Sequence, residues 1–556
     1  MSRRVYKGRF VLFSLLLVLG AVLVFRRVAI GIHIDEEYIV ALGYRSLAGD
    51  SYFLQNQEPQ ILLTPFLSLL EFPFILVTGS TEGILVYLRI VTQIFLVLES
   101  VFIYRELSRY VNCKAGLCAA VFVFCYQYRY LSICDYTFCT CLASTNCFLL
   151  WLNSYTKKEK ISNAIWAGIF FSLMTLCFPS LVILFPLYCW VYSKKSGRKN
   201  IGLILLCCLC LACVEIIVLF NGKSLGEIPE LIAEIISNSS YGKDAGKADK
   251  IPLFIGTLAV FVVVQKYPNV VETIRRNIKR NRKILLLVRS VSGIGILFGL
   301  LLVLQKVAIE GDFYNRNGYL CLLGFGALYI LSGPFCCDLL QMFLWGILCD
   351  QCVGFMTRYD TQGIYALPSF LAIYVCLALS FERQKRVPNK VLACMVLLLM
   401  LGQQLLVKDF WMINNVAVTD KDYIFNQNLS YISEGPAAGV WARKIDAEKY
   451  DELYNWIVNN IHQETKVCYF GKNVLVYLMS PYIRIAVPQM FMDYANDMVL
   501  PKYYEENPQY FPELVILDIS ATSKRQIWPA EEEAFSEAVT IYKSDNYWIF
   551  EENCNT

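Results

Sequence analysis

Three consecutive acidic residues, Asp35, Glu36 and Glu37, follow the first long apolar segment of the chain, in the sequence HIDEEY. Carboxylates are costly to hold next to hydrocarbon, so ionisable residues at a membrane segment indicate a functional site. A carboxylate in this position can take a proton from an attacking hydroxyl group. The alternative interpretation is that these residues are loop acids that only mark an outer face of a membrane.

Further ionisable residues stand at other predicted membrane boundaries on the same face. Arg129 and Asp135 lie in a turn between two apolar segments, Lys243 lies in a polar loop, and Arg358 follows a later apolar segment. Arginine and lysine stabilise a phosphate leaving group as its negative charge develops. Simpler interpretations stay open: an interfacial ion pair of Arg129 with Asp135, solvated loop charge at Lys243, and a headgroup anchor at Arg358.

The elements that must position these residues are membrane helices. The chain has 556 residues, of which 56% are hydrophobic and only 17% charged, with a mean hydropathy of +0.47. A soluble domain is nearer to roughly 45–50% apolar and 25% charged. The apolar residues come in blocks long enough to cross a bilayer as helices. We therefore predict a polytopic α-helical membrane protein with about thirteen spans, at 9–31, 83–104, 115–130, 136–153, 162–178, 180–193, 200–220, 251–266, 284–308, 319–334, 339–356, 364–381 and 390–407.

The distribution of basic residues predicts which side of the membrane each loop occupies. Lysine and arginine in short loops mark the cytoplasmic side. The N-terminus and alternate loops carry the bases, whereas the loops between them carry acids. We therefore expect a cytoplasmic N-terminus and a C-terminal part outside. Counting residues 61–79 as a span breaks this pattern, so we interpret them as amphipathic or re-entrant helices on the outer face. One re-entrant element at 319–356, in place of two spans, would move the C-terminus to the other side.

The composition changes after about residue 408 and becomes mixed and polar. The segment 452–465 has the pattern of an amphipathic helix, and strand-like runs follow at 466–471, 513–519 and 547–552. A helix with several strands predicts a small α/β domain. We therefore divide the chain into a membrane module, residues 1–407 with a first outer loop at 32–82, and an extracytoplasmic α/β domain, residues 408–556.

Metal and nucleic-acid chemistry have little support in the composition. The chain has only two histidines, His33 and His462, which excludes a site built from several histidines. Most of the 22 cysteines lie in apolar blocks, where cysteine acts as a small hydrophobic residue, and we interpret the pair Cys336-Cys337 in this way. A divalent metal at His33 and Glu36 is the alternative to a site without cofactor. No basic patch with interleaved aromatic residues predicts nucleic-acid binding.

Several short motifs resemble those of membrane glycosyltransferases with the GT-C fold. The sequence DEEY at 35–38 resembles the first outer loop of protein O-mannosyltransferases and lipid A aminoarabinose transferases. YRYLSICDYTF at 128–138 resembles the turn after their third span, and RYDTQGIYALPSF at 358–370 resembles their late Arg-Tyr…Pro signature. The resemblance implies a glycosyltransferase that moves a hexosyl or pentosyl group, with inversion, from a polyprenyl- or dolichyl-phosphate donor to a hydroxyl acceptor on a glycan, lipid or protein.

The resemblance also implies roles for individual residues. Asp35 takes the place of the catalytic base, and Glu36 is the neighbour that orients the acceptor or raises the basicity of Asp35. The residues expected to bind the donor phosphate or the substrate are Arg129, Asp135, Lys243, Arg358 and Tyr359.

Two positions depart from the family pattern. The segment NQEPQI at 56–61 carries Glu58 where the family has a lysine that faces the donor phosphate, so Lys223 or Lys243 is expected to take that role. The additional Glu37 leaves the register of the acid pair open by one residue.

Two other classes of function compete with an enzyme. A transporter or flippase of lipid-linked glycans predicts ionisable residues midway along spans, as at Glu99 and Glu215. A non-catalytic membrane scaffold, whose outer domain binds a partner, predicts that the first-loop acids are dispensable.

Overall fold

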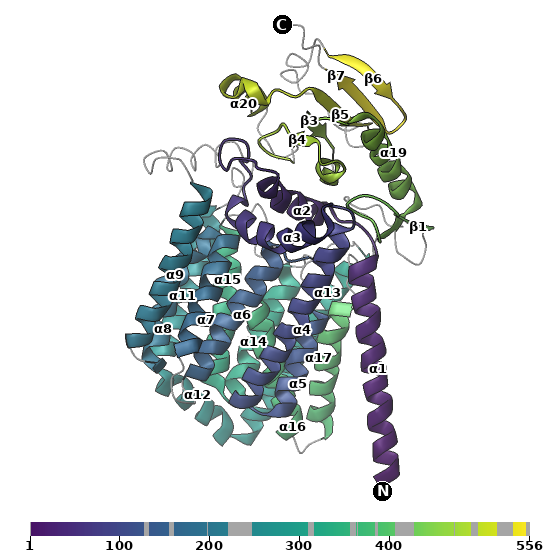
Figure 1. Ribbon diagram of the computed structural model, residues 1–556. Helices are drawn as coiled ribbons and strands as arrows, with labels where there is room; N and C mark the ends of the chain where they lie inside the picture. The colour runs from purple at the N-terminus through teal and green to yellow at the C-terminus, as the bar shows by residue number, and fades with distance from the viewer. Residues whose placement is uncertain are drawn as a thin grey trace.

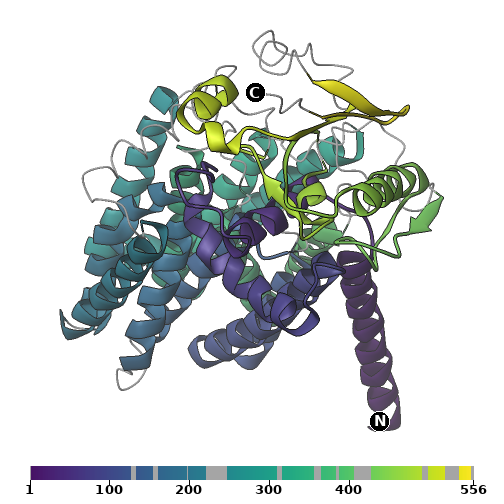
Figure 2. The same ribbon diagram turned by 45° about the horizontal axis from the view of Figure 1, so that its top comes forward.

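The computed structural model consists of a bundle of long helices with a small sheet-containing unit at one end (Figure 1). It describes residues 2–126, 133–154, 161–196, 198–220, 247–309, 316–355, 363, 365–383, 387–405, 428–471, 473–490, 499–519 and 538–551. Both views show α1 (Ser2–Ala29) at the edge of the bundle, with the N-terminus at the end away from the sheet unit (Figures 1 and 2).

Every predicted span coincides with a helix of the bundle. Besides α1, these helices are α4 (Ile84–Tyr110), α5 (Cys113–Cys125), α6 (Tyr136–Ser154), α7 (Ile161–Cys177), α8 (Phe185–Ser196), α9 (Arg198–Leu219), α11 (Lys247–Lys266), α13 (Arg282–Ile309), α14 (Arg316–Ser332), α15 (Cys336–Gly354), α16 (Leu367–Arg383) and α17 (Val387–Leu405). The short helix η2 (Pro179–Leu184) precedes α8. Uniformly apolar runs fold as helices because only a helix pairs the backbone groups of a segment internally.

The number of helices that cross the membrane stays a prediction. By length and composition, five helices within the described residues can span a bilayer, or six if a bent pair is one span, and several shorter apolar helices accompany them. The bent pair is α11 with α12 (Pro268–Arg280), which turns by 87°. The chain turns at a proline because proline disfavours the helical conformation in the residue before it.

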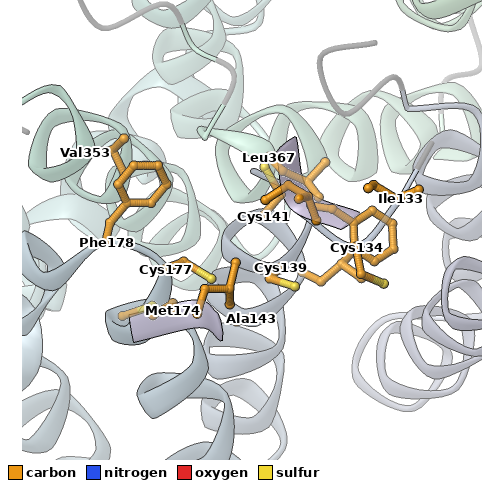
Figure 3. Close-up of a cluster of buried hydrophobic side chains, with 14 of the residues drawn as sticks. Ile133, Cys134, Cys139, Cys141, Ala143, Met174, Cys177, Phe178, Val353 and Leu367 are labelled. Atoms are coloured by element: carbon orange, nitrogen blue, oxygen red, sulfur yellow. The ribbon is translucent and has the colours of Figure 1, made fainter. Parts of the chain in front are cut away.

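The core of the bundle surrounds α6, all of whose residues after Tyr136 are buried. Small thiol side chains fill this core, as Figure 3 shows for Cys134, Cys139, Cys141 and Cys177, which lie among aliphatic and aromatic neighbours. The described cysteines are all free thiols. This packing supports the interpretation of the apolar-block cysteines as small hydrophobic residues.

The first outer loop folds as helices between the bundle and the sheet unit. It contains α2 (Ile34–Leu47), the single-turn η1 (Ile61–Leu63) and α3 (Thr64–Thr78), which lie beside each other at that end (Figures 1 and 2). The segment of η1 and α3 is apolar enough to count as a span by composition. Its position beside α2 fits the interpretation of residues 61–79 as outer-face helices.

The C-terminal unit contains a five-stranded mixed sheet in the order β4-β3-β5-β7-β6. Its strands are β3 (Thr465–Phe470), β4 (Ile483–Ile485), β5 (Leu514–Asp518), β6 (Val539–Lys543) and β7 (Tyr547–Glu551). The chain also forms a β1–β2 hairpin (Leu429–Tyr431 and Trp441–Arg443), helices α19 (Lys444–Asn460) and α20 (Val499–Glu506), and the short helices η3 (Val474–Leu478) and η5 (Pro508–Tyr510). The predicted strands at 466–471, 513–519 and 547–552 are confirmed as β3, β5 and β7. The predicted helix is α19, which begins eight residues earlier than expected.

Candidate active site in the first outer loop

The three acids form the first turn of α2. His33 is the residue before the helix, and its Nδ1 accepts a hydrogen bond of 3.1 Å from the backbone N–H of Asp35. Asp35 is half-buried, whereas Glu36 and Glu37 are only 2% and 3% exposed. Successive helical side chains point about 100° apart, so the three carboxylates reach three different surroundings.

Glu36 is held in a buried ion pair with Arg89 of α4. Its Oε2 lies 2.5 Å from Nη2 of Arg89. The same guanidinium donates hydrogen bonds to the carbonyl oxygens of Val28, at 3.1 Å, and Gly31, at 2.7 Å. The pair therefore fixes the start of α2 against α4 and against the end of α1, and Glu36 is suited to position its neighbour Asp35.

Glu37 faces the C-terminal unit. Its carboxyl group accepts backbone hydrogen bonds from Val474 and Leu475, at the start of η3. Burial, followed by the negative charge of Glu36, raises the pKa of Glu37 well above 4.5. The extra acid in the motif thus contacts the sheet unit, and Asp35 is the acid that keeps partial exposure.

Two arginines at the end of α1 add positive charge beside this pair. Arg26 and Arg27 are buried, and Arg26 is close enough to Arg89 and Glu36 to interact electrostatically with both. Arg27 donates hydrogen bonds to the carbonyl of Phe124, at 2.9 Å, and to Oε1 of Gln93, at 3.3 Å. These arginines and Arg89 were not among the predicted site residues. The available signal was two adjacent arginines at the predicted outer end of a span, where the charge-side rule disfavours them.

An apolar groove lies between α1, α4 and α5. Its volume is about 430 Å³, and its lining includes Leu19, Leu23, Val101, Leu117 and Phe124. The guanidinium carbon of Arg27 lies 5.5 Å from the centre of the Phe124 ring, which closes the groove at that end. The Phe124 end of this apolar groove thus lies near Arg27.

Asp135 is described, and it lies buried at the start of α6. Its Oδ1 accepts a hydrogen bond of 2.7 Å from the backbone N–H of Phe138, and its carbonyl accepts one of 3.0 Å from Cys139. This is the geometry of a helix N-cap, which satisfies a backbone donor that has no partner within the helix. The other residues expected to bind donor or substrate lie outside the described residues, namely Arg129, Lys243, Arg358 and Tyr359, as does Lys223.

Glu58, which stands where the family has a lysine, belongs to a buried ion cluster. Arg45 lies 3.4 Å from Glu58 and 2.7 Å from Asp50, and Glu58 also accepts a hydrogen bond of 2.5 Å from the backbone N–H of Met490. Burial raises the pKa of both carboxyl groups, and the charge of Arg45 opposes this rise. Glu58 therefore connects the first loop to the C-terminal unit.

The two residues of the alternative metal site, His33 and Glu36, both have partners within the protein. His33 Nδ1 accepts from the backbone of Asp35, and Glu36 pairs with Arg89. Among the described residues, one group of potential metal ligands is close enough to hold an ion, and it consists of Glu272, Cys336 and Cys337. This group involves α12, at the far end of the bundle from α2 (Figure 1).

No protein family and no curated protein sequence matches the chain. Among solved structures, the chain is similar to ArnT from Cupriavidus metallidurans bound to undecaprenyl phosphate, with 10% sequence identity, a TM-score of 0.49 and 99% of each chain covered. It is also similar to an Archaeoglobus fulgidus oligosaccharyltransferase in complex with zinc and sulfate, with 14% identity, a TM-score of 0.47, and 97% of this chain and 73% of that chain covered. A third similar structure is the archaeal oligosaccharyltransferase AglB from Archaeoglobus fulgidus in complex with an inhibitory peptide and a dolichol-phosphate. Its sequence identity is 13% and its TM-score 0.46, and the match covers 97% of this chain and 74% of that chain. With identities of at most 14% and TM-scores below 0.5, these similarities assign neither a family nor an activity to the chain, and the resemblance to GT-C fold glycosyltransferases stays a prediction from the sequence.

Proposed function

We propose that the protein is an inverting membrane glycosyltransferase that moves a sugar from a polyprenyl-phosphate donor to a hydroxyl acceptor on the outer face of the membrane. One observation carries the proposal. Half-buried Asp35 stands next to Glu36, which a buried ion pair with Arg89 holds in place, and Arg26 and Arg27 lie beside that pair. A proton acceptor thus adjoins a cluster of positive charge at the end of an apolar groove.

The proposed reaction has one displacement step. The carboxylate of Asp35 takes the proton of the acceptor hydroxyl as its oxygen attacks the anomeric carbon. The bond from that carbon to the phosphate oxygen breaks, and its electron pair leaves with the phosphate. Attack from the side opposite to the phosphate inverts the anomeric centre. Positive charge from the arginines stabilises the negative charge that develops on the leaving phosphate.

The donor-site residues remain part of the proposal. Arg129, Lys243, Arg358 and Tyr359 are proposed to bind the donor phosphate or the sugar, and Asp135 to support them from the start of α6. The apolar groove fits an isoprenoid chain, because the chain has no polar groups and the groove opens between membrane helices. We place the catalytic module at residues 1–407 and an extracytoplasmic domain at 408–556, with a cytoplasmic N-terminus.

The proposal is tested with Asp35→Asn in purified protein supplied with polyprenyl-phosphate sugars. Loss of a general base lowers the rate of transfer by roughly 10²–10⁴-fold. Asp545→Asn removes the same charge from an exposed turn and is the matched control. If Asp35→Asn transfers sugar at the full rate, Asp35 is not the catalytic base. If the wild-type protein transfers sugar from none of these donors, the proposed glycosyltransferase activity is wrong.

Transport of a lipid-linked glycan is a second candidate, because acids do lie buried within the bundle. Glu99 and Glu106 of α4 accept hydrogen bonds from Asn146 and Asn153 of α6, at 2.8 and 2.5 Å. The equal seven-residue spacing on both helices is typical of polar contacts that hold two membrane helices together.

The variant Glu99→Gln separates the two candidates. Glutamine keeps an oxygen that accepts from Asn146 but removes the ionisable group, so a transferase keeps its activity. A transporter that uses the charge of Glu99 loses movement of lipid-linked glycan in reconstituted liposomes. The transporter is favoured if the wild-type protein moves lipid-linked glycan but transfers no sugar, and if Glu99→Gln abolishes that movement.

A further inference from the structure

Two adjacent cysteines at the start of α15 meet a glutamate from α12. The Sγ of Cys336 lies 3.4 Å from Oε2 of Glu272 and 3.9 Å from the Sγ of Cys337. The three potential ligand atoms all lie within 4.8 Å of one another. In the sequence, no further potential metal ligand stands next to the two thiols. The third potential ligand, Glu272, lies 64 positions before Cys336, so only the fold reveals the group.

These distances match the edges of a tetrahedral zinc site. Zinc binds thiolate sulfur at about 2.3 Å and carboxylate oxygen at about 2.0–2.2 Å, so the edges of a tetrahedron are about 3.8 Å between two sulfurs and about 3.6 Å between sulfur and oxygen. The sulfur–sulfur and sulfur–oxygen distances in the structure, 3.9 and 3.4 Å, are close to both. Two of the three edges of the group therefore fit the ion already, and the third, between Cys337 and Glu272, is at most 4.8 Å.

The surroundings of Glu272 also suit a metal ligand. Its Oε1 lies 2.5 Å from Nη1 of Arg275, while Oε2 is the oxygen that faces Cys336. A hydrogen bond to the outer oxygen orients a ligating carboxylate. Two thiolates and one carboxylate carry three negative charges, which a divalent ion and the Arg275 guanidinium balance. Cys336 is buried and Cys337 and Glu272 are half-buried, so the site is partly shielded and still open to a fourth ligand.

We propose that Glu272, Cys336 and Cys337 bind one Zn²⁺ ion, with water as the fourth ligand. The ion fixes α12, which turns by 87° from α11, against the start of α15. This end of the bundle lies opposite the C-terminal unit, on the proposed cytoplasmic side, where thiols stay reduced. The proposal does not depend on the proposed transferase activity, because the zinc site and the first-loop acids lie at opposite ends of the bundle (Figure 1).

The experiment measures zinc bound to the purified full-length protein. Protein stripped with a chelator is titrated with Zn²⁺ in competition with a chromogenic chelator, and bound zinc is counted by elemental mass spectrometry. We expect one zinc per chain for the wild type, none for Cys336→Ser/Cys337→Ser, and at least about tenfold weaker binding for Glu272→Gln. Cys210→Ser/Cys213→Ser removes two exposed thiols from α9 and is the matched control, expected to keep one zinc.

Two further measurements on the wild-type protein do not depend on whether the variants fold. Co²⁺ in place of Zn²⁺ should give a near-ultraviolet charge-transfer band from thiolate ligands. Bound Zn²⁺ should protect Cys336 and Cys337 from alkylation, located by peptide mass spectrometry, and leave the exposed Cys113 at the start of α5 reactive. A stoichiometry below one, an equal loss of zinc in the control, a cobalt spectrum without the thiolate band, or unprotected cysteines would each overturn the proposal.

Discussion

At the scale of single residues, the first-loop motif divides its work among three adjacent acids. Glu36 is paired with Arg89, Glu37 accepts backbone hydrogen bonds from η3, and Asp35 keeps partial exposure. A buried carboxylate with a guanidinium partner is costly to remove and fixes geometry, whereas a half-exposed carboxylate can meet a substrate. The arrangement therefore gives each acid a distinct physical role, although the sequence makes them look equivalent.

Glu37→Gln tests the role of the third acid through pH. The pKa of Glu37 is raised in the folded protein, by burial first and then by the charges of Glu36 and of Asp446 from α19. A raised carboxyl pKa means that the folded state binds the proton more tightly than the unfolded state. The associated stability is complete below about pH 4.5, the unfolded value, and is lost as pH rises toward the folded pKa.

We therefore expect the thermal stability of the wild-type protein in detergent to fall more steeply than that of Glu37→Gln as the pH rises above about 4.5. Glutamine keeps an oxygen for the N–H groups of Val474 and Leu475 and has no charge to bury. Glu448→Gln, an exposed change on α19, should leave the wild-type profile unaltered. Parallel profiles for the wild type and Glu37→Gln would contradict a raised pKa at this position.

The sequence predicts the acids of the site but not their partners. Acids next to an apolar segment are visible in a linear pattern, and their position at the start of a helix follows from it. Arg89 lies 53 residues from Glu36 inside an apolar run, where nothing local shows which residue it meets. The sequence showed only that Glu58 stands where the family has a lysine. It could not show the contacts of Glu58 with Arg45 and Met490, because Met490 belongs to the C-terminal unit, whose position against the first loop depends on the fold.

At the scale of elements, α2 and α3 pack closely where Gly43 faces Glu71. A Cβ atom added to Gly43 would lie 2.2 Å from Oε1 of Glu71, and the hydroxyl of Ser68 donates a hydrogen bond of 2.9 Å to the carbonyl of Gly43. Glu71 is fully buried in this contact. Any larger residue at position 43 therefore forces the buried carboxyl group of Glu71 to shift.

Gly43→Ala should destabilise the protein by about 1–3 kcal/mol, because an added methyl group in a tightly packed contact forces the neighbours to shift. Gly202→Ala is the matched control: Gly202 lies in α9, and an added Cβ there meets nothing within 4 Å. The control should be neutral or slightly stabilising, because alanine favours a helix. Denaturant unfolding measures the free energy of unfolding of both variants. Equal values for Gly43→Ala and Gly202→Ala would show that the contact between α2 and α3 accommodates a methyl group at little cost.

Elements were predictable where one physical rule fixes them. Long apolar runs gave the bundle helices because unpaired backbone groups are excluded from hydrocarbon. The strands β3, β5 and β7 were predicted from buried apolar runs. β4 has three residues and β6 is mostly exposed, so neither has a clear pattern. The beginning of α19 was missed although Ala447 and Tyr450 continue the buried stripe of Leu453 and Ile457 at helical spacing, because charged residues surround them in the sequence.

At the scale of the whole molecule, the first outer loop joins the membrane bundle to the C-terminal unit. Gly31 donates a hydrogen bond of 2.8 Å to the carbonyl of Trp441, Gly83 donates one of 3.0 Å to Gly435, and the hydroxyl of Thr81 donates one of 2.7 Å to Leu478. Glu37 and the Arg45 cluster add side-chain contacts across the same boundary. The candidate site is therefore held between two parts of the chain that are far apart in sequence.

Arg45 is the centre of this joint, and Arg45→Met tests it. Besides Asp50 and Glu58, Arg45 contacts the carbonyl oxygens of Val487 and Pro488, at 2.9 and 3.3 Å. Removing one partner of a buried ion cluster costs about 3–5 kcal/mol, because the remaining charges stay buried without compensation. We expect faster amide hydrogen exchange at residues 486–490 and lower transfer activity, because the C-terminal unit loosens from α2.

Two further variants make the test of the joint specific. Lys444→Met removes a cation whose pair with Glu448 on α19 is exposed, so exchange at 486–490 should stay close to that of the wild type. Adding Asp50→Asn and Glu58→Gln to Arg45→Met removes the uncompensated charges. The triple variant should therefore recover part of the protection from hydrogen exchange at residues 486–490 that Arg45→Met loses. If Arg45→Met leaves both exchange and activity unchanged, the ion cluster does not hold the C-terminal unit, and the contacts of Glu37, Gly31, Thr81 and Gly83 across the same boundary are sufficient.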